Sequence, residues 1–228
     1  ILFPRRTSLP LLERALEDYD VPYTTSGNSL VFVTEDVRDL LSALTAIDDP
    51  TDQVAVVATL RSAAYACSDA DLWAWARDRH SFNYLEGSPG HDGPIAKAFN
   101  SLRTLHGERL DTSPGALIER FVRERRLREL AMAGGRAEER WSRIQLLAEM
   151  ALRLADAGRP SLRDFVLWAR QQAERDVRVP DVASNERADV VRVMTVHAAK
   201  GFEFPIVMLT AKVGEEDRLF GSVTVQNI

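Results

Sequence analysis

The position of the strand-like segments along the chain constrains its fold more than any other feature. Short apolar runs typical of strands occur only near the two ends of the chain, at residues 1–3, 30–33, 190–197, 204–210 and 222–228. Between them, residues 52–175 consist almost wholly of segments with apolar residues at helical spacing. We therefore predict an α/β fold with a mostly parallel sheet, into which an all-α helical domain is inserted.

The domain boundaries are predicted at the places where strand-like segments give way to segments of helical spacing, and where strand-like segments return. We predict that residues 1–60 form the first segment of the α/β domain, 61–186 the inserted helical domain, and 187–228 the returning segment. Residues 176–189 are polar and have no clear period, so we interpret them as the linker that leads back to the sheet.

Residues that can cap helices mark several helix starts. Ser8, Thr34, Ser68 and Ser161 each precede a segment of helical period, and a hydroxyl there can accept from the first backbone N–H groups. The predicted helices span residues 8–20, 35–47, 51–61, 68–79, 94–106, 113–132 and 136–156, with a last one beginning after Ser161.

The composition excludes several classes of protein. Apolar residues make up 45% and charged residues 28% of the 228 residues, which is an ordinary globular balance. The net charge of −5 gives no global attraction for nucleic acid, so any such binding must be local. One cysteine, Cys67, excludes an internal disulfide and a zinc site built from several cysteines.

Targeting signals are also absent from the sequence. No apolar run approaches the roughly 20 residues that a membrane helix needs, and no signal segment opens the chain. We therefore expect no membrane association and a cytoplasmic location. Because the chain begins at Ile1 and not at Met, we also expect it to be a piece of a longer polypeptide.

One loop near the carboxyl end gathers rare polar residues. The stretch "VMTVHAAKGFEF" (193–204) contains one of four histidines, His197, and one of three lysines, Lys200. Both faces of the preceding strand are mostly apolar, as in a covered parallel sheet, and such sheets bind ligands beyond the carboxyl ends of their strands. Gly201 permits a close backbone approach, and Glu203 follows it. From these residues alone the loop is either a candidate site or a polar turn between two strands.

The same loop carries a resemblance to a known family. The stretch "RVMTVHAAKGFEFPIVML" resembles motif V of the UvrD/Rep/RecB class of superfamily 1 DNA helicases. Phe202 replaces the usual Leu of that pattern, which is an apolar exchange. The pattern is matched at eight positions: Met194, Thr195, His197, Lys200, Gly201, Glu203, Phe204 and Pro205.

The resemblance extends to the first part of the chain. Residues 1–23 resemble the stretch in which the family's core passes into its second RecA-like domain, and residues 34–62 resemble the block that leads into the inserted helical domain. The family commonly has an Arg directly after the first strand, where this chain has Pro4. No phosphate contact is therefore assigned to Arg5 or Arg6.

The resemblance implies roles for the matched residues. Thr195 and His197 are expected to touch the backbone of single-stranded DNA, which a hydroxyl and an imidazole can do without reading sequence. Lys200 is grouped with them, either as a phosphate contact or as a residue that holds the loop. Gly201 and Glu203 are expected to face the nucleotide, where Glu203 would accept a hydrogen bond from a ribose hydroxyl.

The sequence lacks other parts that phosphoryl transfer requires. It contains no G-x-x-x-x-G-K-[ST] loop and no acidic Walker B run at the end of a strand, and it stops before the family's later motif with its phosphate-sensing Arg. We therefore expect no catalytic residue and no metal site in this chain, no cofactor bound to it, and no ATP hydrolysis by it alone. ATP and Mg²⁺ are the cofactors expected for the full-length enzyme.

The resemblance implies part of an ATP-dependent DNA helicase that moves 3′ to 5′ and serves DNA repair or recombination. Two short sequence motifs favour the RecB-like, exonuclease-associated branch over the UvrD-like branch: Asp-Pro-x-Asp at 49–52 and Leu-Arg-Ser at 60–62. The expected partners are single-stranded and duplex DNA, the N-terminal RecA-like domain of the same protein, and nuclease or repair subunits. Two alternatives are a non-catalytic interaction module with a remnant motif V and a free-standing nucleic-acid-binding domain.

Further candidates lie in the helical block. Residues 119–143 hold eight Arg and five Glu, either as a basic stripe for duplex phosphates or, as we favour, as a solvated surface with local Glu–Arg pairs. The helix start at Ser68 is a second candidate for duplex contact. Trp73 and Trp75, two residues apart, point to different helix faces, which favours packing or an interface over base stacking. The spacing of the other three histidines is not that of a metal site: His80, His91 and His106.

Overall fold

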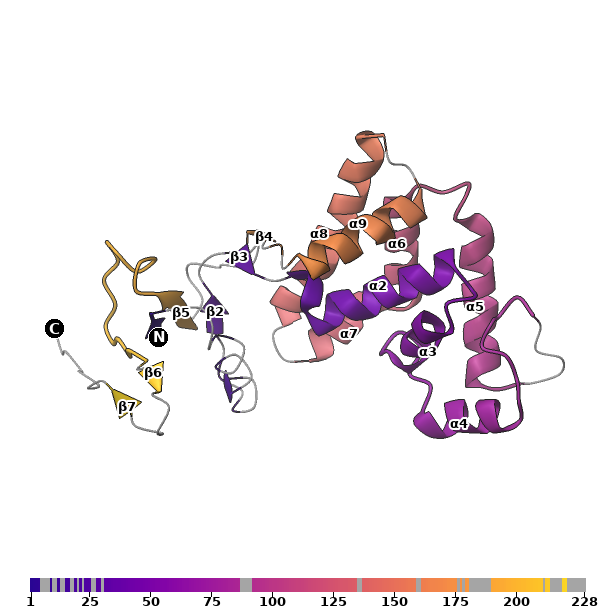
Figure 1. Ribbon diagram of the computed structural model, residues 1–228, viewed down its shortest axis with the longest axis horizontal. Coiled ribbons are helices and arrows are strands. Elements are labelled where there is room, and N and C mark those ends of the chain that lie inside the picture. The colour runs from indigo at the N-terminus through magenta and orange to yellow at the C-terminus, as the bar shows by residue number, and fades with distance from the viewer. Residues whose placement is uncertain are drawn as a thin grey trace. The chain divides into compact units, whose positions relative to one another are not determined.

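The chain divides into two units in the computed structural model (Figure 1), an α/β unit of residues 1–29 with 178–228 and a helical unit of residues 30–177. Most contacts of each unit are made among its own residues. The structure describes residues 1–4, 9, 12, 15–16, 19, 21, 23–25, 28–29, 31–86, 92–134, 137–158, 161–175, 177, 179–180, 190–210, 212–213 and 219–220.

A parallel sheet organises the α/β unit. Strand β5 (Val191–Thr195) lies between β1 (Leu2–Phe3) and β2 (Tyr23–Thr25), and both pairings are parallel. A further parallel bridge joins Leu2 to Leu209. The sheet thus joins segments from the beginning and the end of the chain, as predicted. Two short antiparallel pairs complete the described strands: β3 (Asn28–Ser29) with β4 (Val179–Pro180), and β6 (Lys212–Val213) with β7 (Leu219–Phe220).

The core of this unit forms around the central strand. Val193 is 0% exposed and Met194 4%, so both faces of β5 are covered at its middle, as its apolar sequence predicts. The helix predicted for residues 8–20 lies partly outside the described residues, and Ser8 is one of the residues outside them. Leu12 and Leu16 are described, are helical and pack on the core. The cluster consists of Phe3, Tyr23 and Val193, with Ile1, Leu9, Leu12, Leu16 and Val191 against it.

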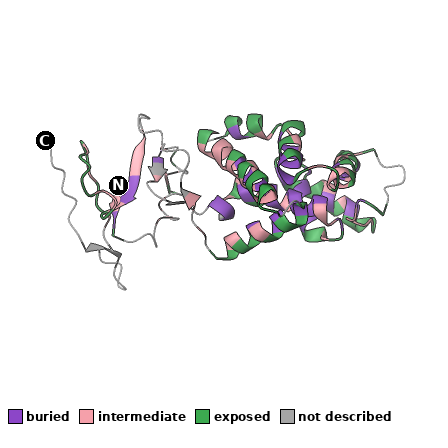
Figure 2. Cartoon of the chain, turned by 90° about the horizontal axis from the view of Figure 1, so that it is seen from above, coloured by how far each residue is buried: buried purple, intermediate pink, exposed green. Residues whose placement is uncertain are grey.

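The helical unit is built around helix α2, which packs against α3, α5, α8 and α9. Leu44 and Ile47 in α2 are fully buried, and the helices around it turn buried faces inward and exposed faces outward (Figure 2). Of the helices that the structure describes, none is long and apolar enough to cross a membrane. The elements are η2 (Val31–Val33), α2 (Glu35–Asp48), α3 (Gln53–Arg61), α4 (Asp69–Arg77), α5 (Pro94–Glu108), α6 (Pro114–Glu124), α7 (Leu127–Ala133), α8 (Ala137–Asp156) and α9 (Leu162–Glu174).

Two of the predicted helix caps are confirmed and one is not. Ser68 forms a capping box with Asp71 at the start of α4, and the Ser161 hydroxyl accepts from the Asp164 N–H at 3.1 Å at the start of α9. Thr34 makes no side-chain cap on α2, because its hydroxyl donates to the Val31 carbonyl at 2.7 Å. This bond is possible because the preceding residues form a 3₁₀ turn.

The prediction of a strand at residues 30–33 is wrong, because Val31–Val33 form the 3₁₀ helix η2. Phe32 is 2% exposed, and its ring meets the Trp168 ring of α9 edge-on at 5.7 Å between centroids. A short apolar run is equally compatible with a buried strand and a buried helical turn, so tertiary packing decides. In the run 204–210 only Leu209 forms a bridge, and the strand predicted for 222–228 lies outside the described residues.

The single helix predicted for residues 113–132 is two helices, α6 and α7. The break falls at Arg126, whose φ of 54° lies in the left-handed region. The neighbouring Arg125 donates from Nε to the Ala64 carbonyl at 2.8 Å, and its guanidinium lies 4.2 Å from the centre of the Tyr65 ring. These contacts fix Arg125 against residues 64 and 65, and the chain leaves the helical path at the next residue, Arg126.

The observed units have different boundaries from the predicted domains. The helical unit begins at Leu30 and ends at Val177, whereas the prediction placed the boundaries after residues 60 and 186. Helix α2 falls in the helical unit because its partners lie there. Its Asp36 accepts from Arg140 of α8 at 2.6 Å, and its Ala46 carbonyl accepts from the Tyr84 hydroxyl at 2.7 Å.

Candidate functional site

The five predicted site residues lie close together in sequence at the carboxyl end of β5: Thr195 ends the strand, His197, Lys200 and Gly201 lie in the turn of residues 196–201, and Glu203 follows that turn. Directly after β5, the Ala199 N–H donates to the Thr195 carbonyl at 3.0 Å and the Phe202 N–H to the Ala199 carbonyl at 3.1 Å. The Val196 N–H donates to the Phe3 carbonyl at 3.1 Å, which ties the start of the turn to the end of β1. The turn therefore stands on the central strand, at the edge of the sheet where parallel sheets bind ligands.

The Thr195 hydroxyl fixes the first part of this turn. It accepts a hydrogen bond from the Ala198 N–H at 3.1 Å, in the manner of a helix N-cap. Thr195 is half-buried, so this bond is partly shielded from water. The proton of the hydroxyl is not used in this bond and remains available to an outside acceptor.

The backbone of Gly201 closes the turn. Its φ is 90°, a conformation that residues with a side chain rarely adopt. A Cβ at this position would meet nothing within 4 Å, so the backbone conformation and not the available space requires glycine.

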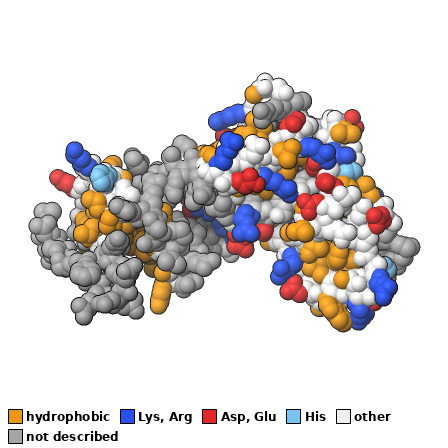
Figure 3. Space-filling view, viewed as in Figure 1, with side chains coloured by type: hydrophobic (Ala, Val, Ile, Leu, Met, Phe, Trp, Pro, Cys, Tyr) orange, Lys and Arg blue, Asp and Glu red, His pale blue; other side chains and the backbone are white. Residues whose placement is uncertain are grey.

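The charged and titratable side chains of the turn face solvent. His197, Lys200 and Glu203 are all exposed. Within the part of the chain that the structure describes, neither Lys200 nor Glu203 has an ion-pair partner. Figure 3 shows a histidine, a basic and an acidic side chain gathered on the surface of the α/β unit. Among the described residues, the side chains of Lys200 and Glu203 thus remain available as donors and as an acceptor, which is the arrangement that a polar ligand needs.

An exposed aromatic side chain next to the turn was not predicted as a feature of the site. Phe202 is 60% exposed, and its ring stacks on that of Phe204 with centroids 6.1 Å apart. The sequence feature that could have indicated this exposed aromatic residue is the one departure from the motif V pattern, Phe202 in place of Leu.

The arginines of residues 119–143 are largely engaged within the helical unit. Arg126 pairs with Glu129 at 3.3 Å, Arg143 pairs with Glu139, and the Arg128 guanidinium lies 5.6 Å from the centre of the Trp141 ring. Arg120 pairs with both Glu108 and Glu124. These contacts favour the interpretation as local Glu–Arg pairs over a basic stripe.

Trp75 and His106 have packing roles in the helical unit. Trp75 is 7% exposed and meets the Phe99 ring edge-on at 5.4 Å, whereas Trp73 is 64% exposed and lies under Arg77, as their spacing predicts. His106 Nδ1 lies 2.7 Å from the Ile47 carbonyl and so binds the end of α2. Among the described residues no group of three or more His, Cys, Asp or Glu could hold a metal ion.

Comparison with known proteins bears out the resemblance of the sequence to UvrD/Rep/RecB-like superfamily 1 helicases, at low identity. The chain is similar to the A subunits of bacterial ATP-dependent helicase/nucleases. It is 24% identical to that of Listeria innocua over 92% of the chain, and 28% identical to that of Ruminiclostridium cellulolyticum over 85%. The protein of Carboxydothermus hydrogenoformans is 27% identical over 83% of the chain.

The match covers only part of each relative. The chain spans 18%, 16% and 17% of the lengths of these three proteins, respectively. No protein-family model matches the chain. The similarity thus covers most of the chain and a small part of each helicase/nuclease protein.

Replacing Thr195 by valine should loosen the turn, because valine keeps the shape of threonine but cannot accept from the Ala198 N–H. Loss of a cap of this kind costs about 1 kcal/mol, so hydrogen exchange at the Ala198 amide should become about five times faster. Thr195→Ser, which keeps the acceptor, should exchange like the unchanged chain. Equal protection in the valine variant would show that the hydroxyl does not hold the turn.

Proposed function

We propose that this chain forms part of an ATP-dependent DNA helicase or translocase that moves 3′ to 5′ in DNA repair or recombination, within the RecB-like, nuclease-associated branch. The observation that carries the proposal is the eight-position motif, which begins in the buried end of a central parallel strand and continues through the exposed turn that follows it. The similarity of most of the chain to helicase/nuclease A subunits supports it. In this proposal the α/β unit is part of the second RecA-like domain, and the helical unit is the inserted domain.

On the proposed DNA side of the turn, Thr195, His197 and Lys200 contact phosphates of single-stranded DNA. The Thr195 hydroxyl can donate outward while it caps the turn, and the exposed imidazole and ammonium groups have donors to offer. Exposure and the lack of an ion pair within the described residues support a phosphate contact for Lys200 over a role in holding the loop. Such contacts position the strand without reading its sequence.

On the proposed nucleotide side, the Gly201 backbone lies close to the nucleotide and the Glu203 carboxylate accepts from a ribose hydroxyl. An exposed carboxylate with no ion-pair partner among the described residues fits such a donor. ATP with Mg²⁺ supplies the phosphoryl group whose hydrolysis drives movement. Because both sets of residues lie within the short segment 195–203, a change at the nucleotide can shift the contacts to DNA.

Neither the phosphate-cradling loop nor the acidic Walker B run is present in the sequence of this chain. We therefore expect that the purified chain alone releases no phosphate from ATP, with or without single-stranded DNA. Robust DNA-stimulated phosphate release by the chain would contradict this proposal.

The role of His197 is tested by replacing it with alanine in the full-length protein. Loss of one charge-assisted contact to phosphate should weaken binding to single-stranded DNA roughly five- to tenfold for every base sequence, with a comparable loss of DNA-stimulated ATP hydrolysis and unwinding. Met208→Ala, at an exposed position of the same unit outside the turn, should leave these activities unchanged. Unaltered DNA binding and unwinding in the His197 variant would remove the histidine from the proposed site.

A further inference from the structure

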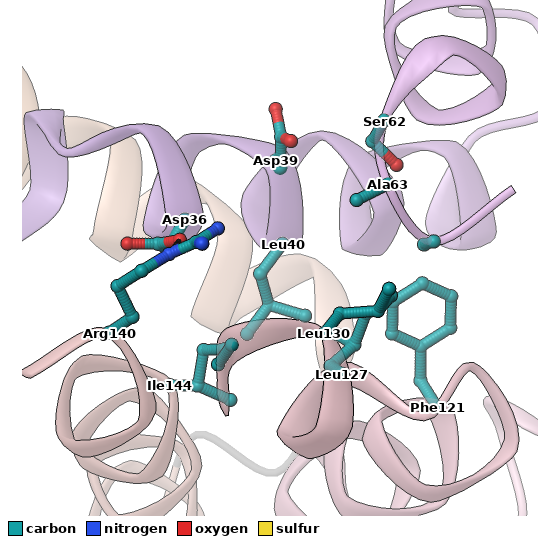
Figure 4. Close-up of a pocket in the computed structure, with 12 residues that line it drawn as sticks. Asp36, Asp39, Leu40, Ser62, Ala63, Phe121, Leu127, Leu130, Arg140 and Ile144 are labelled. Atoms are coloured by element: carbon teal, nitrogen blue, oxygen red, sulfur yellow. Dashed lines mark hydrogen bonds and ion pairs between the residues drawn. The ribbon is translucent and has the colours of Figure 1, made fainter. Parts of the chain in front are cut away.

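A groove on the helical unit is not part of the proposed site (Figure 4). Helix α2 forms one side of it, α6 and α7 form the other, and α8 closes one end. Its lining is mainly apolar, with Leu40, Phe121 and Ile144 buried beneath it and Leu130 exposed to 38% at its rim. Such a lining is complementary to an aliphatic or aromatic group.

The carboxylates of Asp36 and Asp39 lie on the α2 side of the groove and differ in their partners. Asp36 accepts from Nε of Arg140 at 2.6 Å and is therefore satisfied within the chain. Asp39 is half-buried, and within the described residues nothing donates a hydrogen bond to it and no cation pairs with it. Asp39 is thus an unused acceptor beside an apolar surface.

The surroundings of Asp39 disfavour its charge. Burial raises the pKa of Asp39 above its ordinary value, the nearby charges of Glu35 and Asp36 raise it further, and Arg38 and Arg140 oppose this shift. A partly desolvated carboxylate without a donor costs free energy, and a cationic donor offsets that cost. Arg140 also lines the groove, but Asp36 neutralises it, so the remaining charge of Asp39 disfavours a phosphate group.

We propose that this groove binds an arginine side chain of a partner polypeptide. The aliphatic stem of the arginine lies along Leu127 and Leu130, and its guanidinium donates to Asp39. Arginine fits because its apolar stem and weakly hydrated, planar head combine apolar packing with charge-assisted donation to a carboxylate. The proposal does not depend on the helicase function, because it uses residues of the helical unit only.

The test uses the ¹⁵N-labelled 228-residue chain and a matched pair of peptides. The probe is acetyl-Ala-Leu-Arg-Leu-Ala-amide, and its control carries citrulline, a neutral analogue of similar shape, in place of arginine. The arginine peptide should shift the amide signals of Ala63, Leu130 and Ala131 to saturation, and the citrulline peptide should bind about tenfold more weakly. Equal binding of the two peptides, or no shift at the groove, would overturn the proposal.

Substitutions in the chain locate the effect. Asp39→Asn should weaken binding of the arginine peptide about tenfold and leave the citrulline peptide unaffected. Asp156→Asn, at an exposed carboxylate on α8, should change neither. An oligothymidine that shifts the groove signals instead would assign the surface to nucleic acid and defeat the proposal.

The stability of the free chain gives an independent check that Asp39 has no partner. With a raised pKa, the folded chain binds the Asp39 proton more readily than the unfolded chain, so stability falls as pH rises through the window above 3.8. Asp39→Asn should therefore raise the urea midpoint of the helical unit at pH 7, and the gain should vanish as pH falls to 3.8. A lower midpoint for the variant at pH 7 would reveal an internal partner and overturn the proposal.

Discussion

Replacing Phe165 by alanine should lower the free energy of unfolding of the helical unit by about 3–5 kcal/mol. Phe165 of α9 is 0% exposed, and its ring centroid lies 5.9 Å from that of Trp168, which in turn meets Phe32. The substitution removes a ring from the core in which α9 packs against α2, a helix far from it in sequence. The loss combines the free energy of burying the ring, which the variant no longer gains on folding, with the cost of the cavity that remains.

The measurement is urea unfolding followed by the helical signal in circular dichroism. Leu167→Ala is the matched control, because Leu167 lies on the same helix but is 53% exposed. Its substitution should change the free energy of unfolding by no more than about 0.5 kcal/mol. A loss below about 1 kcal/mol for Phe165→Ala would mean that α9 does not pack on α2 as described.

Replacing Asp36 by alanine should destabilise the helical unit by about 2–4 kcal/mol, because it removes the carboxylate that pairs with the largely buried Arg143 and the partly buried Arg140. The Asp36 side chain is 8% exposed, and its partners Arg143 and Arg140 are 11% and 32% exposed. Arg143 keeps its pairing with Glu139, which limits the loss, but its Nε has no partner among the described residues even in the intact protein. Asp36 also lies in the first turn of α2, where a negative charge is favourable.

A second carboxylate on the same helix provides the control. Asp48 pairs with Arg163 of α9 at 2.8 Å; the Asp48 side chain is 15% exposed, but that of Arg163 is 63% exposed, so water screens the pair. Exposed pairs contribute up to about 1 kcal/mol, so Asp48→Ala should cost less than that. Both variants are measured by urea unfolding at pH 7. Similar losses in the free energy of unfolding would show that burial does not make the Asp36 pairs more stabilising than the Asp48 pair.

The sequence predicts helices well where one apolar face repeats over many turns. The helix predicted for 35–47 is observed at 35–48, and the one predicted for 136–156 is observed at 137–156. Such segments have only one way to bury their apolar face. By contrast, the break at Arg126 depends on the contacts of Arg125 with Ala64 and Tyr65, which no local pattern contains.

For the candidate site, the sequence predicts the place of the turn and its residues but not how they are held. The strand before Thr195 and the polar residues after it are local features, so position along the chain locates them. The capping bond of Thr195 and the exposure of Phe202 depend on atomic geometry. The groove beside Asp39 could not be predicted, because residues from 36 to 144 converge on it from several helices.

The antiparallel pair β3 and β4 has a consequence for the modular architecture of the chain. Ser29 lies opposite Val179, so the two segments that flank the helical unit are already aligned as the arms of a hairpin. A two-residue Asn-Gly turn in place of residues 30–178 would close that hairpin without changing its register. We therefore expect that the helical unit can be removed at this point while β1, β5 and β2 keep their pairing.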